Sequence, residues 1–565
     1  FPIVFMDGMT GRLFREFSIV ISGSVIISSF AALTFTPMLA TKLLIKREKQ
    51  SWFYAKTEPF FEGMNRLYSR SLAAFLGKRW IALPFTFITI CLIGILWNAV
   101  PAEMAPLEDR SQISINTRGA EGVTYEYIRD YTEDINQLVD SILPDAESVT
   151  ARVSSGSGNV RITLHDMKDR NYTQMEVAEK ISKAVQKKTM ARSFVQQQSS
   201  FGGRRGSMPV QYVLQATNLE KLEEVLPKFM AKVYENPVFQ IADVDLKFSK
   251  PEARIQINRD KSSIMGVSTK NIAQTLQYGL SGQRMGYFYM NGKQYEILGE
   301  INRQQRNKPA DLKAIYVRSN SGDMIQLDNL IELESGIAPP KLYRYNRFVS
   351  ATISAGLADG KTIGQGLDEM DKIAKETLDD TFRTALSGDS KEYRESSSSL
   401  MFAFILAILL IYLILAAQFE SFKDPLIIML TVPLAIAGAL VFMYFGDITM
   451  NIFSQIGIIM LIGLVAKNGI LIVEFANQKQ EAGEDKMSAI KDAALQRLRP
   501  ILMTSASTVL GLIPLAFATG EGCNQRIAMG TAVVGGMVVS TLLTMYIVPA
   551  IYSYISTNRI KKLQE

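Results

Sequence analysis

One lysine stands inside a segment that is otherwise largely apolar. Lys467 lies in the run LIGLVAKNGILIVEF at residues 461–475. A charged side chain at the centre of a membrane costs about 2.5–3.5 kcal/mol on insertion scales, and ionisable groups in such places mark ion pathways by default. Lys467 is therefore a candidate proton-relay residue. The alternative is that its long stem snorkels toward the lipid headgroups and leaves the ammonium group in water.

The sequence offers Lys467 no counter-ion within its apolar segments. Glu474 follows seven residues later on the same helical face, but it lies near the edge of the segment. We therefore hypothesise that a carboxylate from outside this sequence pairs with the lysine. Protonation of that carboxylate would release the ammonium group and allow the helices to reorient.

Two arginines and a threonine follow in the run LQRLRPILMTS. Arg497 and Arg499 lie at its basic end, and Thr504 lies one to two helical turns inside the apolar part. A hydroxyl group at Thr504 that faces Lys467 would pass protons through water. We name Arg497 and Thr504 as further relay candidates. The alternatives are an ordinary basic flank of a membrane span and a threonine that bonds its own helix backbone.

Two glycine-rich loops are candidates for a substrate path. They read SSGSGN at residues 154–159 and FGGRRG at residues 201–206, and the first supplies the candidates Gly156 and Gly158, followed by Arg161. Ordinary flexible turns explain such loops equally well.

Other kinds of chemistry are excluded by composition. The two cysteines, Cys91 and Cys523, and the single His165 provide neither a disulfide framework nor a metal cluster. The run GLADGKT at residues 356–362 has three residues between its glycines, whereas a phosphate-binding loop needs four. No nucleotide or nucleic-acid motif is present. The expected energy source is an ion gradient, with no cofactor.

Seven segments are long and apolar enough to cross a bilayer, which takes about 20 residues. The loop at residues 42–79 carries nine basic and three acidic residues, which predicts a cytoplasmic location for it. By alternation, the long segment from Pro101 to about Ser399 lies on the far side of the membrane. The predicted spans are Phe17–Leu39, Trp80–Val100, Leu400–Ala417, Pro425–Phe445, Ile452–Phe475, Ile501–Ala518 and Ile527–Ile551.

The long polar segment alternates short strands with amphipathic helices, which predicts two split βαβ modules. A strand-rich and turn-rich stretch at residues 281–340 interrupts the second module and predicts an additional subdomain. Its aromatic group, Tyr287, Phe288, Tyr289 and Tyr295, is expected to form a small core or a ligand surface.

The two ends of the sequence are repeats of each other. FPIVFMDG at the start matches IPLAFATG at residues 513–520, and the register continues without a gap through Pro37 and Pro549. Transporters built from two like halves are a known plan, so we expect this chain to be the C-terminal half of a longer protein, with about 430 residues upstream of Phe1. Residues 1–6 would be the tail of an eighth span.

Three membrane motifs carry a family resemblance. The runs LAAQFESFKDPLIIMLTVPLAIAGAL (415–440), GLVAKNGILIVEFAN (463–477) and RLRPILMTSASTVLGLIPLA (497–516) resemble the resistance-nodulation-division (RND) efflux pumps, in their hydrophobe/amphiphile, or multidrug, branch. PAEMAPLEDRSQISI (101–115) is similar to the same branch, and the resemblance covers essentially the whole chain.

The resemblance implies an α-helical transmembrane bundle with an α+β periplasmic domain of two ferredoxin-like porter modules and a docking insertion. The implied domains are residues 1–44 (end of the first-half membrane domain), 45–79 (cytoplasmic amphipathic linker helix), 80–100 (transmembrane helix), 101–399 (porter domain), 400–555 (five-helix bundle) and 556–565 (cytoplasmic tail).

The resemblance also implies a function and partners. The protein would be a homotrimeric, multi-pass transporter of the bacterial inner membrane that exchanges protons for drugs or other amphiphiles. It would contact membrane lipid and work with a periplasmic adaptor, or membrane fusion, protein and an outer-membrane channel, and it would bind no nucleic acid. Lys467, Arg497 and Thr504 fall on the family's relay positions, while its relay aspartates belong to the other half.

One departure bears on the substrate. Multidrug members often carry phenylalanines around the loop that here reads SSGSGN, and Arg161 follows that loop instead. This favours a more polar substrate, a lipid or another native compound. Copper or silver efflux is an alternative because the chain has 25 methionines, although they are scattered. A protein-translocation accessory is a further alternative, against which the insertion argues.

Overall fold

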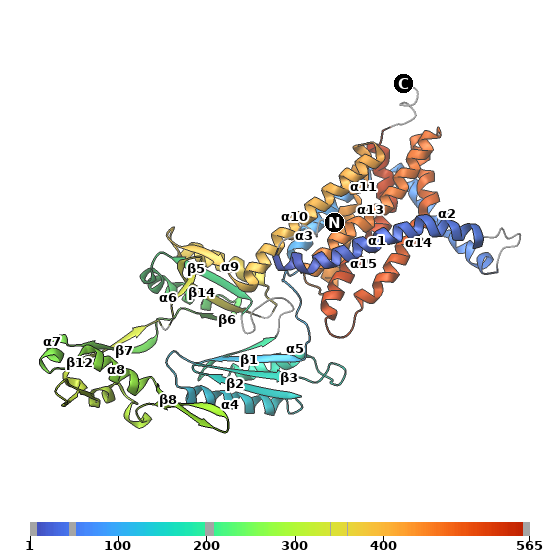
Figure 1. The fold of residues 1–565 in the computed structure, drawn as a ribbon. Coiled ribbons are helices and arrows are strands. Elements are labelled where there is room, and N and C mark those ends of the chain that lie inside the picture. The colour runs from blue at the N-terminus through green and yellow to red at the C-terminus, as the bar shows by residue number, and fades with distance from the viewer. Residues whose placement is uncertain (1–7, 44–51, 198–207, 340, 359, 558–565) are drawn as a thin grey trace. The chain divides into compact units, whose positions relative to one another are not determined.

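Seven long apolar helices form the part of the chain that can cross a membrane. The computed structural model describes residues 8–43, 52–197, 208–339, 341–358 and 360–557. Within these residues, seven helical segments have the length and hydropathy of membrane spans, at the seven places predicted from the sequence. The helices are α1 (Gly8–Leu43), α3 (Ala82–Ala99), α10 (Gly388–Phe419), α11 with α12 (Lys423–Met429 and Thr431–Phe445), α13 (Ile452–Glu481), α14 (Lys486–Ala516) and α15 (Cys523–Ile555) (Figure 1). Residues 1–6, the predicted tail of an eighth span, lie outside the described residues.

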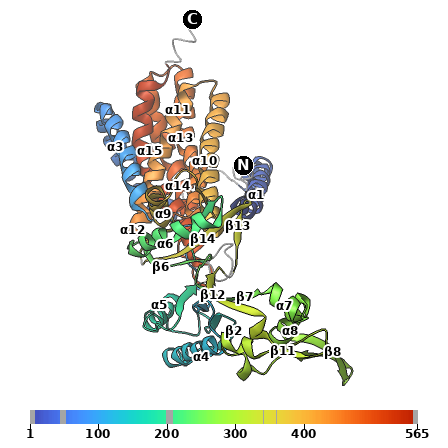
Figure 2. The same cartoon turned by 90° about the vertical axis from the view of Figure 1, so that its left-hand side faces the viewer.

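Helix α15 is central to the bundle, where it packs against α12, α13 and α14 (Figure 2). Its glycines allow this close approach. A β-carbon at Gly530 would lie 2.5 Å from the backbone nitrogen of Ala516 on α14, and one at Gly536 would lie 2.9 Å from the carbonyl oxygen of Ala435 on α12. Small residues at such contacts are typical of helix packing in membranes, where the lipid supplies no hydrophobic drive for association.

Two helix boundaries differ from the hydropathy prediction. Helix α10 begins at Gly388 rather than Leu400, because its polar first turns pack on the strand β5 (Val210–Ala216): the Ser390 hydroxyl accepts a hydrogen bond from the Gln211 amide at 2.8 Å. The segment between the predicted spans Ile452–Phe475 and Ile501–Ala518 is largely helical, since α13 continues to Glu481 and α14 begins at Lys486. Hydropathy marks only the apolar part of a helix, so both boundaries were placed inside helices.

The predicted linker helix is present as α2 (Trp52–Gly77), which packs against α14 and α15. Its Tyr68 is buried and donates a hydrogen bond to the carbonyl oxygen of Met545 at 2.6 Å. This contact fixes the helix to the bundle.

The first α/β module has the strand order β2-β3-β1-β4, with antiparallel neighbours. One sheet face carries the apolar residues that alternate along β1, and they pack with the helices in a core around Ile113, Ile115, Tyr131 and Ile181. The chain order is β1 (Gln112–Arg118), α4 (Tyr125–Ile142), β2 (Ser148–Ser154), β3 (Ser157–Thr163), α5 (Gln174–Val185) and β4 (Arg192–Gln197).

The second module repeats this arrangement with a long interruption. Strands β6 and β5 both pair with β14, and β15 pairs with β5, all antiparallel. The chain order is β5, α6 (Leu219–Glu235), β6 (Phe239–Val244), then β13 (Tyr343–Tyr345), β14 (Phe348–Leu357), α9 (Ile363–Thr377) and β15 (Arg383–Leu386). The interruption therefore leaves after β6 and returns before β13.

The interruption forms a separate compact unit of residues 119–127 and 246–343. It is larger than the insertion predicted at residues 281–340, because strand β7 pairs with β12 rather than with the second module. The predicted aromatic core is wrong: Tyr289 is 76% exposed, and the buried core contains Ile272, Leu327 and Leu330. Its elements are β7 (Lys250–Ile257), α7 (Arg259–Ile264), α8 (Thr269–Leu280), β8 (Gln283–Met290), β9 (Lys293–Gly299), β10 (Tyr316–Arg318), β11 (Met324–Gln326) and β12 (Ile331–Ala338).

The close approach of α14 and α15 gives a stability prediction. Replacing Gly530 by alanine puts a methyl group against the α14 backbone, which we expect to cost about 1–3 kcal/mol, as overpacking usually does. Thermal unfolding of the purified protein in detergent measures the loss. Gly511→Ala on α14 is the matched control, because nothing lies within 4 Å of the added carbon. Equal melting temperatures for the two variants would contradict the packing described for Gly530.

Candidate functional site

Lys467 lies on α13, where it is partly buried, and its Nζ donates a hydrogen bond to the Thr508 hydroxyl of α14 at 3.1 Å. Helix α13 has a well-defined start, since the Asn451 side chain accepts hydrogen bonds from the Phe453 and Ser454 amides. The lysine follows about four turns from that cap, at 3.6 residues per turn.

A threonine that the sequence analysis passed over therefore contacts the lysine. The Thr508 hydroxyl accepts from Lys467 and donates to the Thr504 carbonyl oxygen at 2.8 Å. Thr504 lies one turn away, and its own hydroxyl donates to the Ile501 carbonyl oxygen at 3.2 Å. Thr508 lies four residues after Thr504, so helical spacing alone would have placed both hydroxyls on one face.

This face of the helix pair is open. Thr504 is exposed, and only 17% of the most apolar part of α14 is buried. Within the described residues, no carboxylate lies within ion-pair distance of Lys467. Glu474 accepts instead from the Gln478 amide group at 3.0 Å. The ammonium group thus lies at the edge of an exposed surface, and in the part of the chain that the structure describes the Thr508 hydroxyl is its only polar contact.

The next residue on α13 points the other way, into the bundle. The Asn468 amide donates to Ser505 of α14 at 3.3 Å and to Thr541 of α15 at 3.2 Å, and all three side chains are buried. The Thr541 hydroxyl also contacts Ser505 at 3.2 Å. This triad of Asn468, Ser505 and Thr541 joins α13, α14 and α15 at the level of Lys467.

Arg497 does not contact Lys467. Its guanidinium group stacks over the Phe475 ring at 4.3 Å, and its buried Nε has no hydrogen-bond partner among the described residues. Phe475 lies eight residues beyond Lys467, or about 12 Å along α13. The structure therefore places Arg497 and Lys467 on the same helix pair but at different levels.

Arg499 binds the linker helix. Its Nη atoms lie 2.9 Å and 3.3 Å from the two carboxylate oxygens of Glu58 on α2, and its guanidinium group lies over the Phe61 ring at 5.3 Å. Paired contacts of this kind fix geometry as well as charge. Helix α14 is thus held to α2 at its polar end.

The substrate-path candidates lie around the β2–β3 hairpin of the first module. Gly156 is in the turn with φ of +80°, a conformation that favours glycine. A β-carbon at Gly158 would lie 2.1 Å from the Thr132 hydroxyl oxygen of α4, so this glycine packs against the helix. Arg161 is exposed, on the sheet face opposite the buried residues of β3. The loop at residues 201–206 lies outside the described residues.

A polar ladder follows on that open sheet face. The Asn159 amide donates to the Asn116 side-chain oxygen at 2.8 Å, and Asn116 donates to the Gln196 oxygen at 3.1 Å. These residues come from β3, β1 and β4, and together they give the face amide character rather than aromatic character.

Membrane helices with a lysine inside one span, joined to two α/β modules, define a multi-pass membrane transporter. The chain belongs to the AcrB/AcrD/AcrF family, an RND permease family, whose model matches residues 1–556. It is 30% identical over 570 aligned positions to an uncharacterized transporter of Haemophilus influenzae. The match covers 99% of this chain and 55% of that relative, so the chain spans about half the length of the relative.

The buried triad gives a prediction for stability. Replacing Asn468 by alanine removes the amide that bonds Ser505 and Thr541, and a buried hydrogen-bond partner lost in this way costs about 1–3 kcal/mol. We expect a lower melting temperature in detergent. Gln478→Ala, at an exposed position of the same helix, is the control. A variant Asn468→Ala as stable as this control would mean that the triad does not hold the helices together.

Proposed function

We propose that this chain is the C-terminal half of a proton-driven efflux transporter, which exports amphiphilic compounds, drugs among them, in exchange for protons. The observation that carries the proposal is the place of Lys467. Its side chain extends from a membrane helix onto an open surface, where the ammonium group donates a hydrogen bond to the Thr508 hydroxyl. That hydroxyl donates in turn to the Thr504 carbonyl oxygen, one helical turn away. An ammonium group in such a place needs a carboxylate partner or water to be stable.

The partner of Lys467 would come from the other half of the protein. The chain covers 55% of its relative, which leaves room for a second set of spans. A carboxylate from those spans would cover the surface of Thr504 and Thr508 and pair with Lys467. Proton uptake by that carboxylate would break the ion pair and change the packing of α13 against α14. Lys467 and Thr504 act directly in this relay, and Thr508 joins them. Arg497 would belong to the same relay at the polar end of α14.

The location and assembly follow from the same proposal. The basic loop at residues 42–79 would be cytoplasmic, and the α/β modules would lie in the periplasm of a bacterium, above the inner membrane. The strand order of both modules supports ferredoxin-like porter domains. The unit of residues 119–127 and 246–343 would then dock onto a periplasmic adaptor or an outer-membrane channel, in a homotrimer.

The open face of the first module favours a substrate with polar groups. Arg161 and the ladder of Asn116, Asn159 and Gln196 offer amide and cationic groups. Gly156 would allow the turn of the adjoining β2–β3 hairpin, and Gly158 would allow that hairpin to pack against α4. We therefore propose an amphiphile that carries hydrogen-bonding or anionic groups, rather than a purely aromatic drug.

The relay lysine gives the central test. Lys467→Met keeps the length of the side chain and removes its charge, and we expect it to abolish proton-linked export. The measurement is efflux of ethidium, Nile red and an anionic bile salt from cells or proteoliposomes that contain the intact transporter, with a pH-sensitive dye for proton flux. Lys479→Met, on the same helix outside the apolar run, is the matched control. Unchanged export by Lys467→Met would defeat the relay assignment.

The hydroxyl of Thr508 gives a second test. Thr508→Val has nearly the same shape but cannot accept the hydrogen bond from Lys467, and we expect a loss of export of about a hundredfold, the lower end of the effect of a general acid–base group. Thr508→Ser keeps the hydroxyl and should retain export. The pH dependence of export separates a relay role from a packing role: if valine and serine variants share one rate and one pH profile, Thr508 is outside the relay.

A further inference from the structure

The connection between α3 and β1, residues 101–111, is held by hydrogen bonds along most of its length, although it contains no helix or strand. A chain segment between a membrane helix and a soluble module is ordinarily free to bend, because ordering each residue costs about 1–2 kcal/mol of backbone entropy. We call residues 101–111 the strap. Three sets of contacts hold it, and each joins it to a different part of the fold.

The first set joins the strap to the turn between α12 and α13. The Met450 amide donates to the Pro101 carbonyl oxygen at 2.7 Å, and the Glu103 amide donates to the Met450 carbonyl oxygen at 3.0 Å. The Glu103 carboxylate accepts a hydrogen bond from the Thr449 hydroxyl. Burial raises the pKa of Glu103, and the bond from Thr449 partly opposes this.

The second set joins the strap to the start of α15. Glu108 is only 1% exposed, and its Oε1 accepts from the Gln525 amide at 2.9 Å. The Asn524 side chain donates to the Leu107 carbonyl oxygen at 2.7 Å. The first amides of a helix have no partner within the helix, and the helix dipole favours an anion there, so a carboxylate is well suited to this contact.

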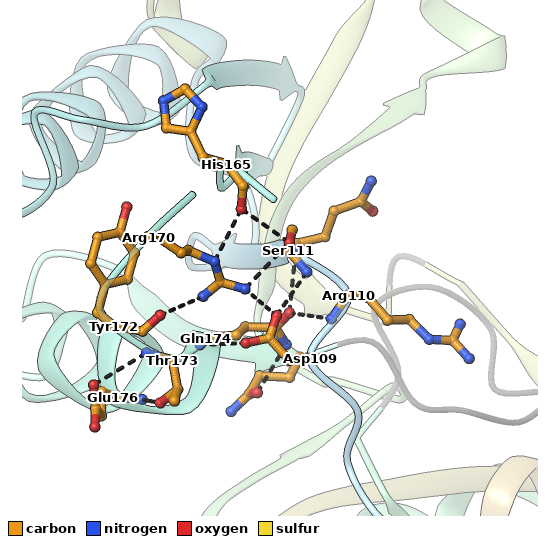
Figure 3. A network of polar contacts seen from close by, with 11 residues as sticks. Asp109, Arg110, Ser111, His165, Arg170, Tyr172, Thr173, Gln174 and Glu176 are labelled. Carbon is orange, nitrogen blue, oxygen red and sulfur yellow. Dashed lines mark hydrogen bonds and ion pairs between the residues drawn. The ribbon is translucent and has the colours of Figure 1, made fainter. Parts of the chain in front are cut away.

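The third set joins the strap to the first α/β module (Figure 3). The Asp109 carboxylate accepts from the Gln174 amide at 2.9 Å, at the first residue of α5, and forms an ion pair with Arg170. The Arg170 guanidinium group is fully buried and also donates to the carbonyl oxygens of His165 and Tyr172, at 3.0 Å and 2.9 Å.

The Gln174 side chain completes this third contact, because its Oε1 accepts from the amides of Arg110 and Gln112, at 2.9 Å and 3.1 Å (Figure 3). Gln174 is buried. The start of β1 and the start of α5 are therefore held by one side chain, beside the bond from Asp109.

We propose that the strap is a coupling element, in which Glu108 and Asp109 pass a displacement of α15 in the membrane to β1 and α5 of the first module. The two residues are adjacent, so their α-carbons are about 3.8 Å apart and cannot separate. A shift at the start of α15 must therefore move the module or break a buried hydrogen bond. Helix α15 also carries Thr541, which bonds the neighbour of Lys467.

The Asp109 contact holds its charge at neutral pH. Burial alone would raise the pKa of Asp109, but hydrogen bonds from the Gln174 amide, Arg170 and the Ser111 amide outweigh it and lower the pKa below its ordinary value of 3.8. A carboxylate with a lowered pKa contributes stability above its unfolded-state pKa, and this contribution is lost only as the pH falls through the lower folded-state value. The contact of Asp109 with Arg170 and Gln174 is therefore intact throughout the neutral pH range.

The test separates coupling from folding. Glu108→Ala removes the acceptor for the Gln525 amide, while Glu108→Gln keeps an acceptor oxygen of the same shape. In proteoliposomes with the intact transporter, we expect Glu108→Ala to lose dye export by about tenfold, within the usual range of coupling energies, while proton flux persists. Glu108→Gln should export as the wild type does. Equal loss of export and proton flux in Glu108→Ala, or none, would overturn the proposal.

A cross-link decides the outcome should Glu108→Ala fail to fold. Glu108→Cys and Gln525→Cys, in a protein with Cys91→Ala and Cys523→Ala, are joined by a short bifunctional methanethiosulfonate, which forms a reducible disulfide with each thiol and releases sulfinate. We expect the cross-linked protein to export like its cysteine-free parent with Glu108 and Gln525 intact, and reduction to lower export again. A cross-linked protein without export would show that the strap must detach from α15, contrary to the proposal.

A readout without any substrate keeps the inference separate from the proposed function, on which its transport role rests. Hydrogen exchange is measured for the amides of β1 and α5 in wild type, Lys467→Met, Glu108→Ala and the double variant. We expect Lys467→Met to alter exchange in the module only when Glu108 is present. The same response in both backgrounds, or none in either, would refute the strap as the route, whether or not the dyes are exported.

Discussion

The structure depends on an ammonium group inside the membrane part that no carboxylate among the described residues pairs with. Lys467 bonds a hydroxyl of the neighbouring helix, and the adjacent Asn468 ties three helices together through buried hydroxyl groups. The two side chains have different roles: Asn468 faces the core and fixes the packing of the helices, while Lys467 faces an open surface. Because a single turn of α13 carries both, a movement of Lys467 acts on the same place that sets the contacts of α14 and α15.

Polar contacts at the ends of the helices extend this arrangement. Arg499 and Glu58 hold α14 to α2 at one end, and Glu108 accepts a hydrogen bond from the Gln525 amide in the first turn of α15 at the other. Both are carboxylate contacts between segments far apart in the sequence. In each case a helix of the bundle is bonded to a segment that is not itself a membrane span, and each of these segments also contributes a buried side chain to the bundle core, Leu72 from α2 and Met104 from the strap.

Much of the fold follows from the sequence because it depends on local pattern. Apolar length predicts all seven spans, and alternation predicts β1 and β2. Helix ends were harder, since the polar first turns of α10 are helical through packing on β5 rather than through hydropathy. The sequence predicted that the insertion begins at residue 281, whereas the separate unit begins at residue 246. The difference arises because β7 pairs with β12, a contact between segments about 80 residues apart that no local pattern reveals. For the site, helical spacing could have found Thr508, whereas Glu58 and Glu108 depend on tertiary contacts.

The separate unit of residues 119–127 and 246–343 leaves the second module after β6 and returns at β13, which leads directly into β14, and β6 and β14 are hydrogen-bonded neighbours. Its points of exit and entry are thus set by one strand pair that forms whatever lies between them. A segment inserted at such a junction can be longer or shorter while the hydrogen bonds between β6 and β14 stay the same. The length and surface of that unit can therefore change without altering the register of this strand pair or the contacts of Lys467.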